Sequence, residues 1–564
     1  MATLFDSPDS QLLSEEVNYI SGGFANDIEL HLLKPDQAAR LLNISPDVTG
    51  RLQKRQGIEK YGSAGTGSPN GLSAFEAPIQ GINLLVGQWG SAIYSSTGDD
   101  TWTRRASSVS LADTPYMGVQ GKGRNGLPTL FLASCVGVTD NVSLPYGNLV
   151  CLDSSFGVTE TALRARSLAW FQNRLFHFNS ASSGPAFLGW SKPLDGRDNS
   201  NGQTVEIESD NGDQGVAIVP MRDSTPRMLL FKERSVHMLE MYWATDGYYP
   251  TTANTLDFTK SLLRPISLNT GCVSTRGVVW VPGQSQADLL FLSREGIRSL
   301  ARSQTDAQGG AGPPLSRSID PTIQRINWNA ADRAAAGFWN NIAYFAVPVD
   351  GSTRNNLVIA YDVLRESFFE LDWAASAWTP AKLTSDRKFF FMSASAATES
   401  GLGTPASGIT NGYHVYQIEG TQVDPGNAPV QFDIQTRAFS FDSGGPPGSG
   451  MRNRKKWNYL SLAIQAASTA ATLALQYKVD DDDAWSTLRY LYVDPADGYP
   501  NLPVQLPFGF SVGRVLRRDI LLRDVRPGYK IQLRVTDAAS FARLKLISLV
   551  VYANPINPKF TSVG

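Results

Sequence analysis

Two short stretches of the sequence, residues 170–177 and 338–345, share nearly the same pattern. In each, two aromatic residues precede a pair of amides, Gln-Asn in the first and Asn-Asn in the second, and an aromatic-rich segment follows. Asn tolerates the positive φ that the central residues of a tight hairpin require, so both stretches are predicted to be β-hairpins. Hairpins of one type recurring through a long chain favour repeated antiparallel units, such as the blades of a β-propeller, over an enzyme cleft on a parallel sheet.

Length and composition support this reading. A chain of 564 residues is too long for one hydrophobic core, so two to four domains are expected. Gly (50) and Pro (32) together make up roughly 15% of the residues, where about 12% is usual. This excess suits a turn-rich, all-β protein.

Charge and cysteine content exclude several classes of protein. Lys and Arg (50) nearly balance Asp and Glu (52), so no overall field attracts nucleic acid or an anionic membrane. The three cysteines, Cys135, Cys151 and Cys272, include no C-x-x-C pair, which argues against disulfide scaffolding and zinc. The start of the sequence lacks the basic and apolar regions of a secretion signal, and no run of 18 apolar residues occurs. Synthesis in a reducing cytoplasm and no membrane span are therefore expected.

The sequence divides into three segments. Residues 1–70 are expected to form an N-terminal arm and platform segment, with a short helix from Pro35 to about Asn43, because Pro and Asp favour a first helical turn. A Gly/Ser-rich stretch then marks a first boundary. Residues 71–425 consist of short apolar runs closed by turn residues, as in β-meanders, and are predicted to be a β-propeller-like domain with long inserted loops.

Three further hairpins are predicted inside the propeller-like segment, at residues 228–239, 289–300 and 357–371. Each pairs two apolar runs across a short turn. Any all-β domain contains such pairs, so an assortment of β-sandwiches remains an alternative to a propeller.

A Gly/Pro-rich stretch at residues 444–450 marks a second boundary, and residues 426–564 are predicted to be a C-terminal β-sandwich-like platform domain. An Ala-rich stretch in this domain resembles a helix. However, Leu460, Leu462 and Ile464 alternate with a period of two, which indicates a strand.

Motifs that could carry chemistry are weak. Residues 95–102 are similar to the Asp-box turn of sialidase-type propellers, but Asp and Gly are out of order. Residues 118–126 have the glycines and lysine of a phosphate loop without its spacing. The acidic stretches 208–213 and 480–483 do not match a calcium loop, and solvated turns explain them better.

Titratable residues do not form a recognisable constellation. The four histidines (His31, His177, His237 and His414) are scattered, which removes support for metalloprotease or histidine-based triad chemistry. The basic residues of 452–457 and 514–526 fit a charged strand face. The sequence therefore yields no catalytic residue, no cofactor site and no metal site, and the chain is expected not to be an enzyme.

One loop stands out as a candidate contact. Residues 243–262 are longer than a meander needs and carry Trp243, Tyr248 and Tyr249. Long aromatic loops seldom remain bare. These three residues are predicted to lie at a contact between subunits, at a constriction, or against a glycan.

Several segments together resemble a known family. Residues 35–57, with Pro35 and the Gly-Arg-Leu-Gln-Lys-Arg-Gln-Gly run at their end, are similar to the opening of tail nozzle proteins, also called tail tubular protein B, of short-tailed bacteriophages. Residues 205–236, 271–297 and 456–462 resemble later parts of the same family. The resemblance covers most of the chain, but its motifs are turns and aromatic residues without a catalytic signature.

The resemblance implies a structural virion protein of the phage tail, made in the host bacterial cytoplasm. Six copies would form a ring below the adaptor ring of the head, with genomic DNA leaving through the lumen without specific binding. Tail fibres, spikes or a tail needle are further implied partners. A near-neutral chain fits this role, since strong contacts to phosphates would slow sliding.

Two hypotheses of other classes remain open. The first is a carbohydrate- or receptor-binding propeller, motivated by the aromatic loop. The second is a propeller glycosidase, whose only support is the imperfect Asp-box; such an enzyme needs two carboxyl groups at a defined separation.

Overall fold

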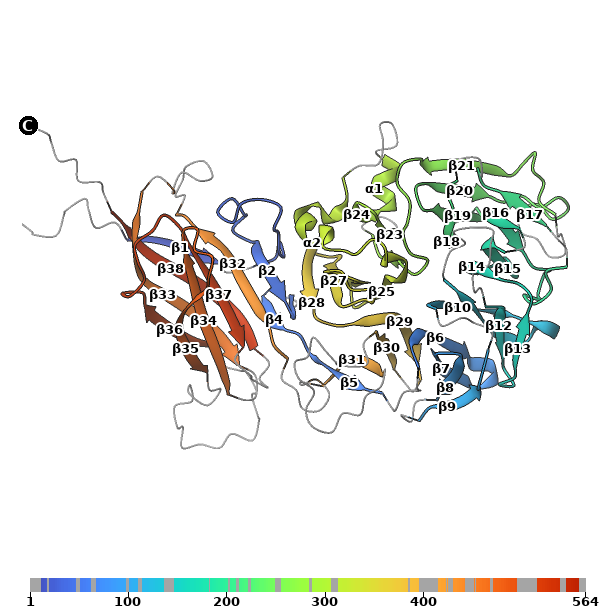
Figure 1. Ribbon diagram of the computed structural model, residues 1–564, viewed down its shortest axis with the longest axis horizontal. Coiled ribbons are helices and arrows are strands. Elements are labelled where there is room, and N and C mark those ends of the chain that lie inside the picture. The colour runs from blue at the N-terminus through green and yellow to red at the C-terminus, as the bar shows by residue number, and fades with distance from the viewer. Residues whose placement is uncertain are drawn as a thin grey trace, which may run out of the picture.

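The computed structural model shows two β-rich parts side by side, a β-propeller-like ring and a β-sandwich (Figure 1). The chain is thus all-β, as the sequence predicted. Its described residues are 12–17, 20–46, 51–61, 67–97, 101–109, 114–135, 147–181, 183–200, 203–208, 212–221, 225–248, 255–283, 287–305, 313–383, 386–394, 414–421, 424, 430–441, 451, 453–466, 470–493, 515–537 and 544–556. Within these ranges, no helix has the length and apolar character to cross a membrane.

The ring consists of seven blades in the described part of the chain, each an antiparallel sheet of three or four strands. In chain order, the blades are β6 (Pro69–Ala77), β7 (Ile82–Trp89), β8 (Ala92–Ser96) and β9 (Thr103–Ala106); β10 (Tyr116–Lys122), β11 (Pro128–Ser134), β12 (Leu149–Asp153) and β13 (Val158–Thr161); β14 (Ala165–Phe171), β15 (Arg174–Ser180), β16 (Gly184–Trp190) and β17 (Thr204–Glu206); β18 (Gly215–Met221), β19 (Arg227–Lys232), β20 (Val236–Glu240) and β21 (Leu262–Ser267); β22 (Val278–Val281), β23 (Asp288–Ser293) and β24 (Gly296–Ser299); β25 (Ala335–Trp339), β26 (Ile342–Val347), β27 (Leu357–Asp362) and β28 (Ser367–Leu371); and β29 (Ala375–Lys382), β30 (Arg387–Ser393), β31 (Val415–Thr421) and β5 (Gly57–Lys60). The helices are short: α1 (Leu300–Thr305), α2 (Asp320–Gln324) and the 3-10 turns Pro78–Gln80, Arg124–Gly126, Leu315–Ile319 and Ala331–Arg333.

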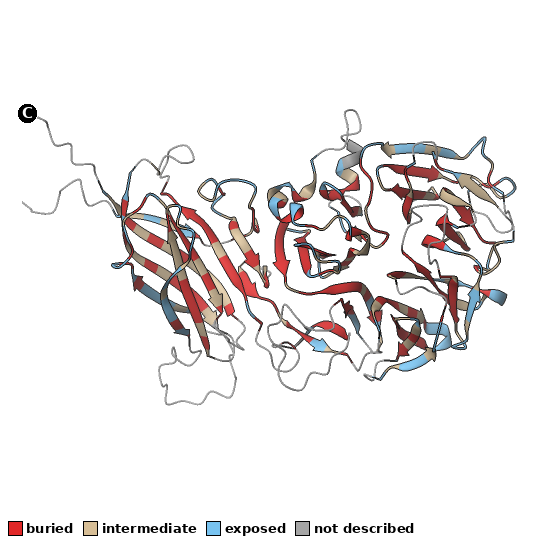
Figure 2. Cartoon of the chain, viewed as in Figure 1, coloured by how far each residue is buried: buried red, intermediate tan, exposed pale blue. Residues whose placement is uncertain are grey.

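The middle strands of the blades are buried on both faces, because each blade packs between two neighbours. In β19 the side chains from Met228 to Phe231 are all buried, as are those of β23 from Leu289 to Leu292. A strand covered on both faces reads as a continuous apolar run without alternation. Figure 2 shows this buried interior, with exposed residues confined to the rim.

The predicted hairpins are confirmed. In the turn between β14 and β15, Gln172 and Asn173 have φ of 47° and 60°; in the turn between β25 and β26, Asn340 and Asn341 have φ of 48° and 65°. Positive φ at both central residues is the geometry of a type I′ turn, whose twist matches that of the strands. The hairpins predicted at 228–239, 289–300 and 357–371 are β19–β20, β23–β24 and β27–β28.

The ring is closed by a strand from its own N-terminal side. Strand β5 pairs with β31 as the outermost strand of the last blade, with Ile58 opposite Ile418. The inner strand of that blade, β29, packs against β6 of the first blade. The last blade therefore takes three strands from the end of the propeller segment and its fourth strand, β5, from the residues that precede the first blade.

The sandwich is built from both ends of the chain. One sheet has the order β3 (Ile44–Pro46), β4 (Leu52–Lys54), β38 (Leu544–Pro555), β33 (Lys455–Ala466) and β36 (Val515–Leu521), with β1 (Leu13–Val17) also paired to β38; the other contains β2 (Ala38–Leu42), β32 (Asp433–Phe439), β37 (Ile531–Asp537), β34 (Ala471–Val479) and β35 (Ser486–Val493). The propeller is thus inserted between β4 and β32. The Ala-rich stretch forms β33 and β34, as its period of two predicted, and the Gly/Pro-rich stretch 444–450 lies outside the described residues.

The helix predicted from Pro35 to Asn43 is wrong, because Ala38–Leu42 is strand β2. Pro35 and Asp36 form a turn before it. The signal for a helix start was local, whereas the strand is fixed by distant partners: β2 pairs antiparallel with β32 and parallel with β28. Tertiary pairing of this kind overrides a short stretch of helical propensity.

Strand β2 joins the two parts of the molecule in one sheet. It lies between β28 of the propeller and β32 of the sandwich. The resulting nine-stranded sheet has the order β25-β26-β27-β28-β2-β32-β37-β34-β35. The link to β28 is a parallel pairing of Leu42 with Glu370. Arg40 lies across the seam, with Nε 3.4 Å from Glu370 and Nη1 3.3 Å from Asp433.

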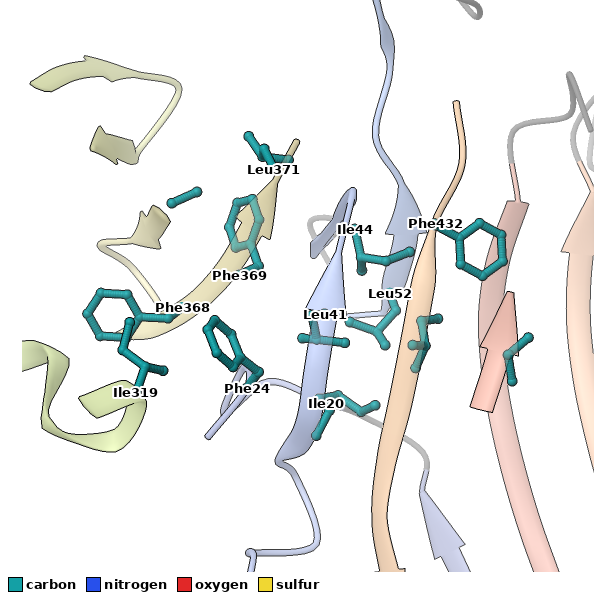
Figure 3. Close-up of a cluster of buried hydrophobic side chains, with 14 of the residues drawn as sticks. Ile20, Phe24, Leu41, Ile44, Leu52, Ile319, Phe368, Phe369, Leu371 and Phe432 are labelled. Atoms are coloured by element: carbon teal, nitrogen blue, oxygen red, sulfur yellow. The ribbon is translucent and has the colours of Figure 1, made fainter. Parts of the chain in front are cut away.

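Apolar side chains from both parts fill the junction (Figure 3). Phe24 lies beside Phe368 of β28, Leu41 lies with Ile44 and Leu52 farther from β28, and Phe432 points into the sandwich. These side chains are at most 5% exposed, so the two parts share one continuous core. Burying apolar surface of this kind contributes about 1.5–3 kcal/mol per large side chain.

A buried ion cluster lies in the same junction. The Arg55 guanidinium makes a two-pronged contact with Asp424, with both N···O distances 2.9 Å, and its Nη2 lies 3.2 Å from Asp372. Its Nε donates to Asn43 Oδ1 at 3.0 Å, and Trp373 covers one face of the guanidinium. Burial raises the pKa of Asp372, whereas Arg55 opposes that shift. Arg55 therefore holds together segments more than 300 positions apart.

We expect Arg55→Met to lower the free energy of unfolding by about 3–5 kcal/mol, because it leaves two buried carboxylates without their partner. Arg325→Met removes a similar two-pronged pair, with Asp350, that is exposed on both sides, and should cost less than about 1 kcal/mol. Its long 4.0 Å contact with Glu370 is also lost, but that carboxylate keeps Arg40 as its partner. Denaturant unfolding followed by tryptophan fluorescence measures both values. Equal losses in the two variants would contradict the role given to Arg55.

Candidate functional site

The largest described cavity lies at the centre of the propeller, where the inner strands of four consecutive blades end. Its volume is about 790 Å³. Its lining comes from β10, β14, β18, β22, β23 and α1: Val119, Gln120, Leu168, Ala169, Trp170, Phe171, Ile218, Val219, Pro220, Met221, Trp280, Ala287, Asp288, Leu289, Leu300 and Ala301. A concave, mostly apolar site of this size is typical of small-molecule binding.

Aromatic rings form part of its wall. Trp170 is stacked on Phe131, with ring centroids 6.1 Å apart and planes 8° from parallel. Its ring also lies on Gly121: a Cβ built on that glycine would lie 2.3 Å from Trp170 Cε3. Gly121 belongs to the phosphate-loop-like stretch, which here forms β10 and the following 3-10 turn. That glycine therefore serves the packing of an aromatic wall.

Two polar side chains in the lining are already engaged. Asp288 Oδ1 accepts hydrogen bonds from the backbone N–H groups of Leu289 at 2.7 Å and Ala301 at 3.0 Å, while Oδ2 accepts from the Ser299 hydroxyl at 2.6 Å. Gln120 Oε1 accepts from the backbone N–H of Glu76 in the neighbouring blade at 3.0 Å. These bonds fix both side chains, so the cavity presents aromatic faces with a few oriented polar groups at its edge.

In the predicted contact loop, the Trp243 side chain lies in the interior of the propeller. Trp243 is fully buried, with its ring edge-on to Trp190 at 5.9 Å and the Arg174 guanidinium 4.1 Å above it. Its Nε1 donates to Gln172 Oε1 at 2.9 Å. The Trp243 side chain is therefore part of the core between two blades and does not present its ring to a partner.

Among the described residues of this loop, Tyr248 is 38% exposed and Phe258 is 59% exposed, whereas Tyr249 lies outside them. The contact prediction named Tyr248 and Tyr249 and missed Phe258. The Tyr248 ring rests on Tyr242, with centroids 5.0 Å apart. The backbone carbonyl of Tyr248 accepts a 2.7 Å hydrogen bond from Gln172 Nε2, in the hairpin turn of the preceding blade. The described part of the loop thus packs on that turn.

The burial of Trp243 has a signal in the sequence. Leu239, Met241 and Trp243 alternate with a period of two, and all three are buried. The strand pattern therefore continues beyond the end of β20. The length and aromatic content of the loop do not reveal this alternation, so they did not predict the burial of Trp243.

The other sequence candidates are structural where the chain is described. His177 and His237 are buried in β15 and β20, and burial lowers the pKa of His177 to about 4. Asp480 accepts the backbone N–H groups of Tyr529 and Lys530, as expected of a turn. No group of three or more His, Cys, Asp or Glu side chains in the described segments is arranged to hold a metal ion.

Comparison with known proteins gives matches among solved structures only. No family model and no curated relative matches the chain. An exo-β-1,3-galactanase from Phanerochaete chrysosporium, crystallised with galactose, is 11% identical over 88% of this chain and 100% of its own, with a TM-score of 0.23. A Bacteroides ovatus xyloglucan GH43B protein is 10% identical over 88% of this chain and 99% of its own, with a TM-score of 0.23. BBS1N, in complex with ARL6DN, is 10% identical over 69% of this chain and 88% of its own, with a TM-score of 0.24.

These matches correct one prediction. The chain was expected not to be an enzyme, and this expectation is contradicted because glycoside hydrolases are prominent among the similar structures. None of the three structures named above is a phage tail protein. At identities of 8–11% and TM-scores of 0.22–0.24, however, they assign neither a reaction nor a substrate to this chain.

We expect Trp243→Ala to lower the free energy of unfolding by about 3–5 kcal/mol, as for other large-to-small changes in a packed core. Tyr248→Ala, on the surface of the same loop, should change it by about 0.5 kcal/mol. Urea unfolding of both variants gives the comparison. If the two substitutions cost the same, Trp243 is not the anchor of this loop.

Proposed function

We propose that the chain is a structural protein of a short bacteriophage tail, a nozzle component that assembles through its sandwich into a ring of identical subunits. The resemblance of residues 35–57, 205–236, 271–297 and 456–462 to tail nozzle proteins supports this function. The observation that carries it in the structure is the far edge of the sandwich, formed by β35 and β36, each of which ends its own sheet without a further partner among the described residues.

This edge, formed by β35 and β36, carries large apolar side chains in solvent. Tyr490 and Tyr492 of β35 are 63% and 58% exposed, and Leu521 of β36 is 59% exposed. In β35 the alternate residues Leu491 and Val493 are buried, so the tyrosines form the outward face of the last strand. Exposed edge strands with apolar side chains favour pairing with another chain.

The junction between the two parts suits a subunit of a channel. A shared sheet and the Arg55 cluster tie the propeller and the sandwich directly to each other through described residues. A ring made of such subunits would keep a constant bore. The mixed charge of β36, where Arg517 and Arg518 stand beside Asp519, also limits attraction to passing DNA.

The proposal extends to partners and location. The assembly would be a homo-hexamer in the virion tail, seated on the adaptor ring, with genomic DNA passing through its lumen without specific binding. Tail fibres, spikes or a tail needle would attach to the assembled ring. Synthesis would take place in the host bacterial cytoplasm.

Electron microscopy and light scattering of the purified chain, with and without cognate adaptor rings, test the proposal. We expect six-fold rings with a central channel. Tyr490→Asp combined with Tyr492→Asp should weaken assembly at least about 10-fold, as loss of central interface aromatics usually does. Ile79→Asp is the matched control, since Ile79 is 96% exposed at a distance from this edge. A chain that remains monomeric with its adaptor, or rings indifferent to the tyrosine changes, would count against it.

A second candidate function, a carbohydrate- or receptor-binding propeller, is favoured by the central cavity. Trp170, Phe171 and Trp280 line it, and aromatic faces are surfaces on which apolar faces of a ligand can stack. This function is compatible with the same chain assembling into a tail.

Glycan-array binding, together with turnover of a panel of aryl glycosides, tests the second candidate. Trp280→Ala should reduce binding at least about 10-fold, whereas Trp485→Ala, a half-buried tryptophan of the sandwich, should leave it unchanged. Silence on both the array and the panel would remove this candidate and leave the assembly proposal standing.

A further inference from the structure

A second, smaller pocket lies at the opposite end of the inner strands. The central cavity is lined where β10, β14 and β18 end, whereas this pocket is lined where β6, β25 and β29 begin. Its volume is about 140 Å³. Three arginines and two asparagines contribute to its wall: Arg276, Arg333, Arg354, Asn70 and Asn355.

Arg276 is held at the wall by the backbone. Its Nη1 donates to the carbonyl of Asn70 at 3.2 Å and its Nη2 to the carbonyl of Arg333 at 3.3 Å. Its Nε is buried and has no acceptor among the described residues. Burial lowers the pKa of Arg276, the neighbouring Arg333 adds to this effect, and Asp332 opposes it. The guanidinium is thus preorganised but incompletely neutralised.

Asn355 supplies an acceptor at the same wall. The residue is 3% exposed, and its Nδ2 donates to the carbonyls of Arg333 at 3.0 Å and Ala375 at 2.8 Å. Those two bonds fix the orientation of the amide. Its Oδ1 is buried and receives no hydrogen bond from the described residues.

We propose that this arginine pocket binds a small oxyanion and that it prefers hydrogenphosphate. In the described part of the chain, neither Arg276 nor Arg333 forms a salt bridge with a carboxylate, and Asp332 acts on Arg276 only as a nearby charge. The two guanidinium groups therefore remain able to pair with an anion. Guanidinium groups bind oxyanions with strong, directed hydrogen bonds. The unfilled Asn355 acceptor suits an anion that also carries a proton, which hydrogenphosphate does and sulfate does not.

The size of the pocket limits the source of the anion. About 140 Å³ admits a free phosphate or the carboxylate end of an acidic sugar, and excludes a nucleic acid duplex. The pocket belongs to the propeller, so anion binding there does not depend on assembly through the sandwich edge.

Isothermal titration and thermal unfolding of the full chain, with sodium phosphate, sulfate, acetate or glucuronate against sodium chloride at equal ionic strength, test the proposal. We expect phosphate to bind and raise Tm in proportion to its concentration, as a ligand of the folded state does, and sulfate to bind at least about 10-fold more weakly. A stronger response to glucuronate than to phosphate would instead assign the pocket to the carboxylate of an acidic sugar.

Arg333→Gln and Arg354→Gln should each weaken anion binding about 10-fold or more, since each removes charge-assisted hydrogen bonds. Arg264→Gln, an exposed arginine of the outer strand β21, is the matched control and should change nothing. Where a glutamine variant does not fold, Arg333→Lys keeps the positive charge but loses the paired N–H donors of the guanidinium, and it should still weaken binding. Failure of all four anions to exceed chloride, or binding unaffected by Arg333→Gln and Arg354→Gln, overturns the proposal.

Discussion

The pairing of β2 with β28 is the interaction on which the arrangement of this molecule depends. One parallel bridge, between Leu42 and Glu370, makes a propeller blade and a sandwich sheet into a single surface. Backbone hydrogen bonds alone would leave such a seam weak, because each contributes only about 0.5–1.5 kcal/mol. The shared apolar core and the Arg55 cluster stabilise it from both sides. The orientation of the two parts thus follows from packing as well as from pairing.

Within the propeller, stability comes from the faces of the blades. Each middle strand is covered on both sides, and aromatic residues fill the spaces between blades, as Trp243 does against Trp190 and Arg174. Because the blades meet around an axis, the two ends of their inner strands have different surroundings. One end opens onto an apolar cavity and the other onto a charged pocket.

Local signals predicted the fold well where the structure is itself local. The amide pairs at 172–173 and 340–341 determine their turns by positive φ, and this requirement can be read directly from the residues. The helix predicted near Pro35 failed because the partners of β2 lie about 330 and 390 positions away. The central cavity could not be predicted for the same reason: its aromatic residues come from separate blades. For Trp243 the sequence allows half of the prediction. Its alternation with Met241 indicates a buried strand position, but its packing partners Trp190 and Arg174 lie too far away in the chain to be predicted.

The insertion of the propeller between β4 and β32 has a consequence for the order of folding during synthesis. As the chain leaves the ribosome, β1 to β4 emerge first, but their sandwich partners β32, β33 and β38 emerge last. The same holds for β5, which waits for β31 before the ring can close. The inner blades can fold in sequence, since their strands pair with near neighbours, whereas the sandwich must await the final segment. The surface formed by β35 and β36 is therefore built only after the propeller, when most of the chain has left the ribosome.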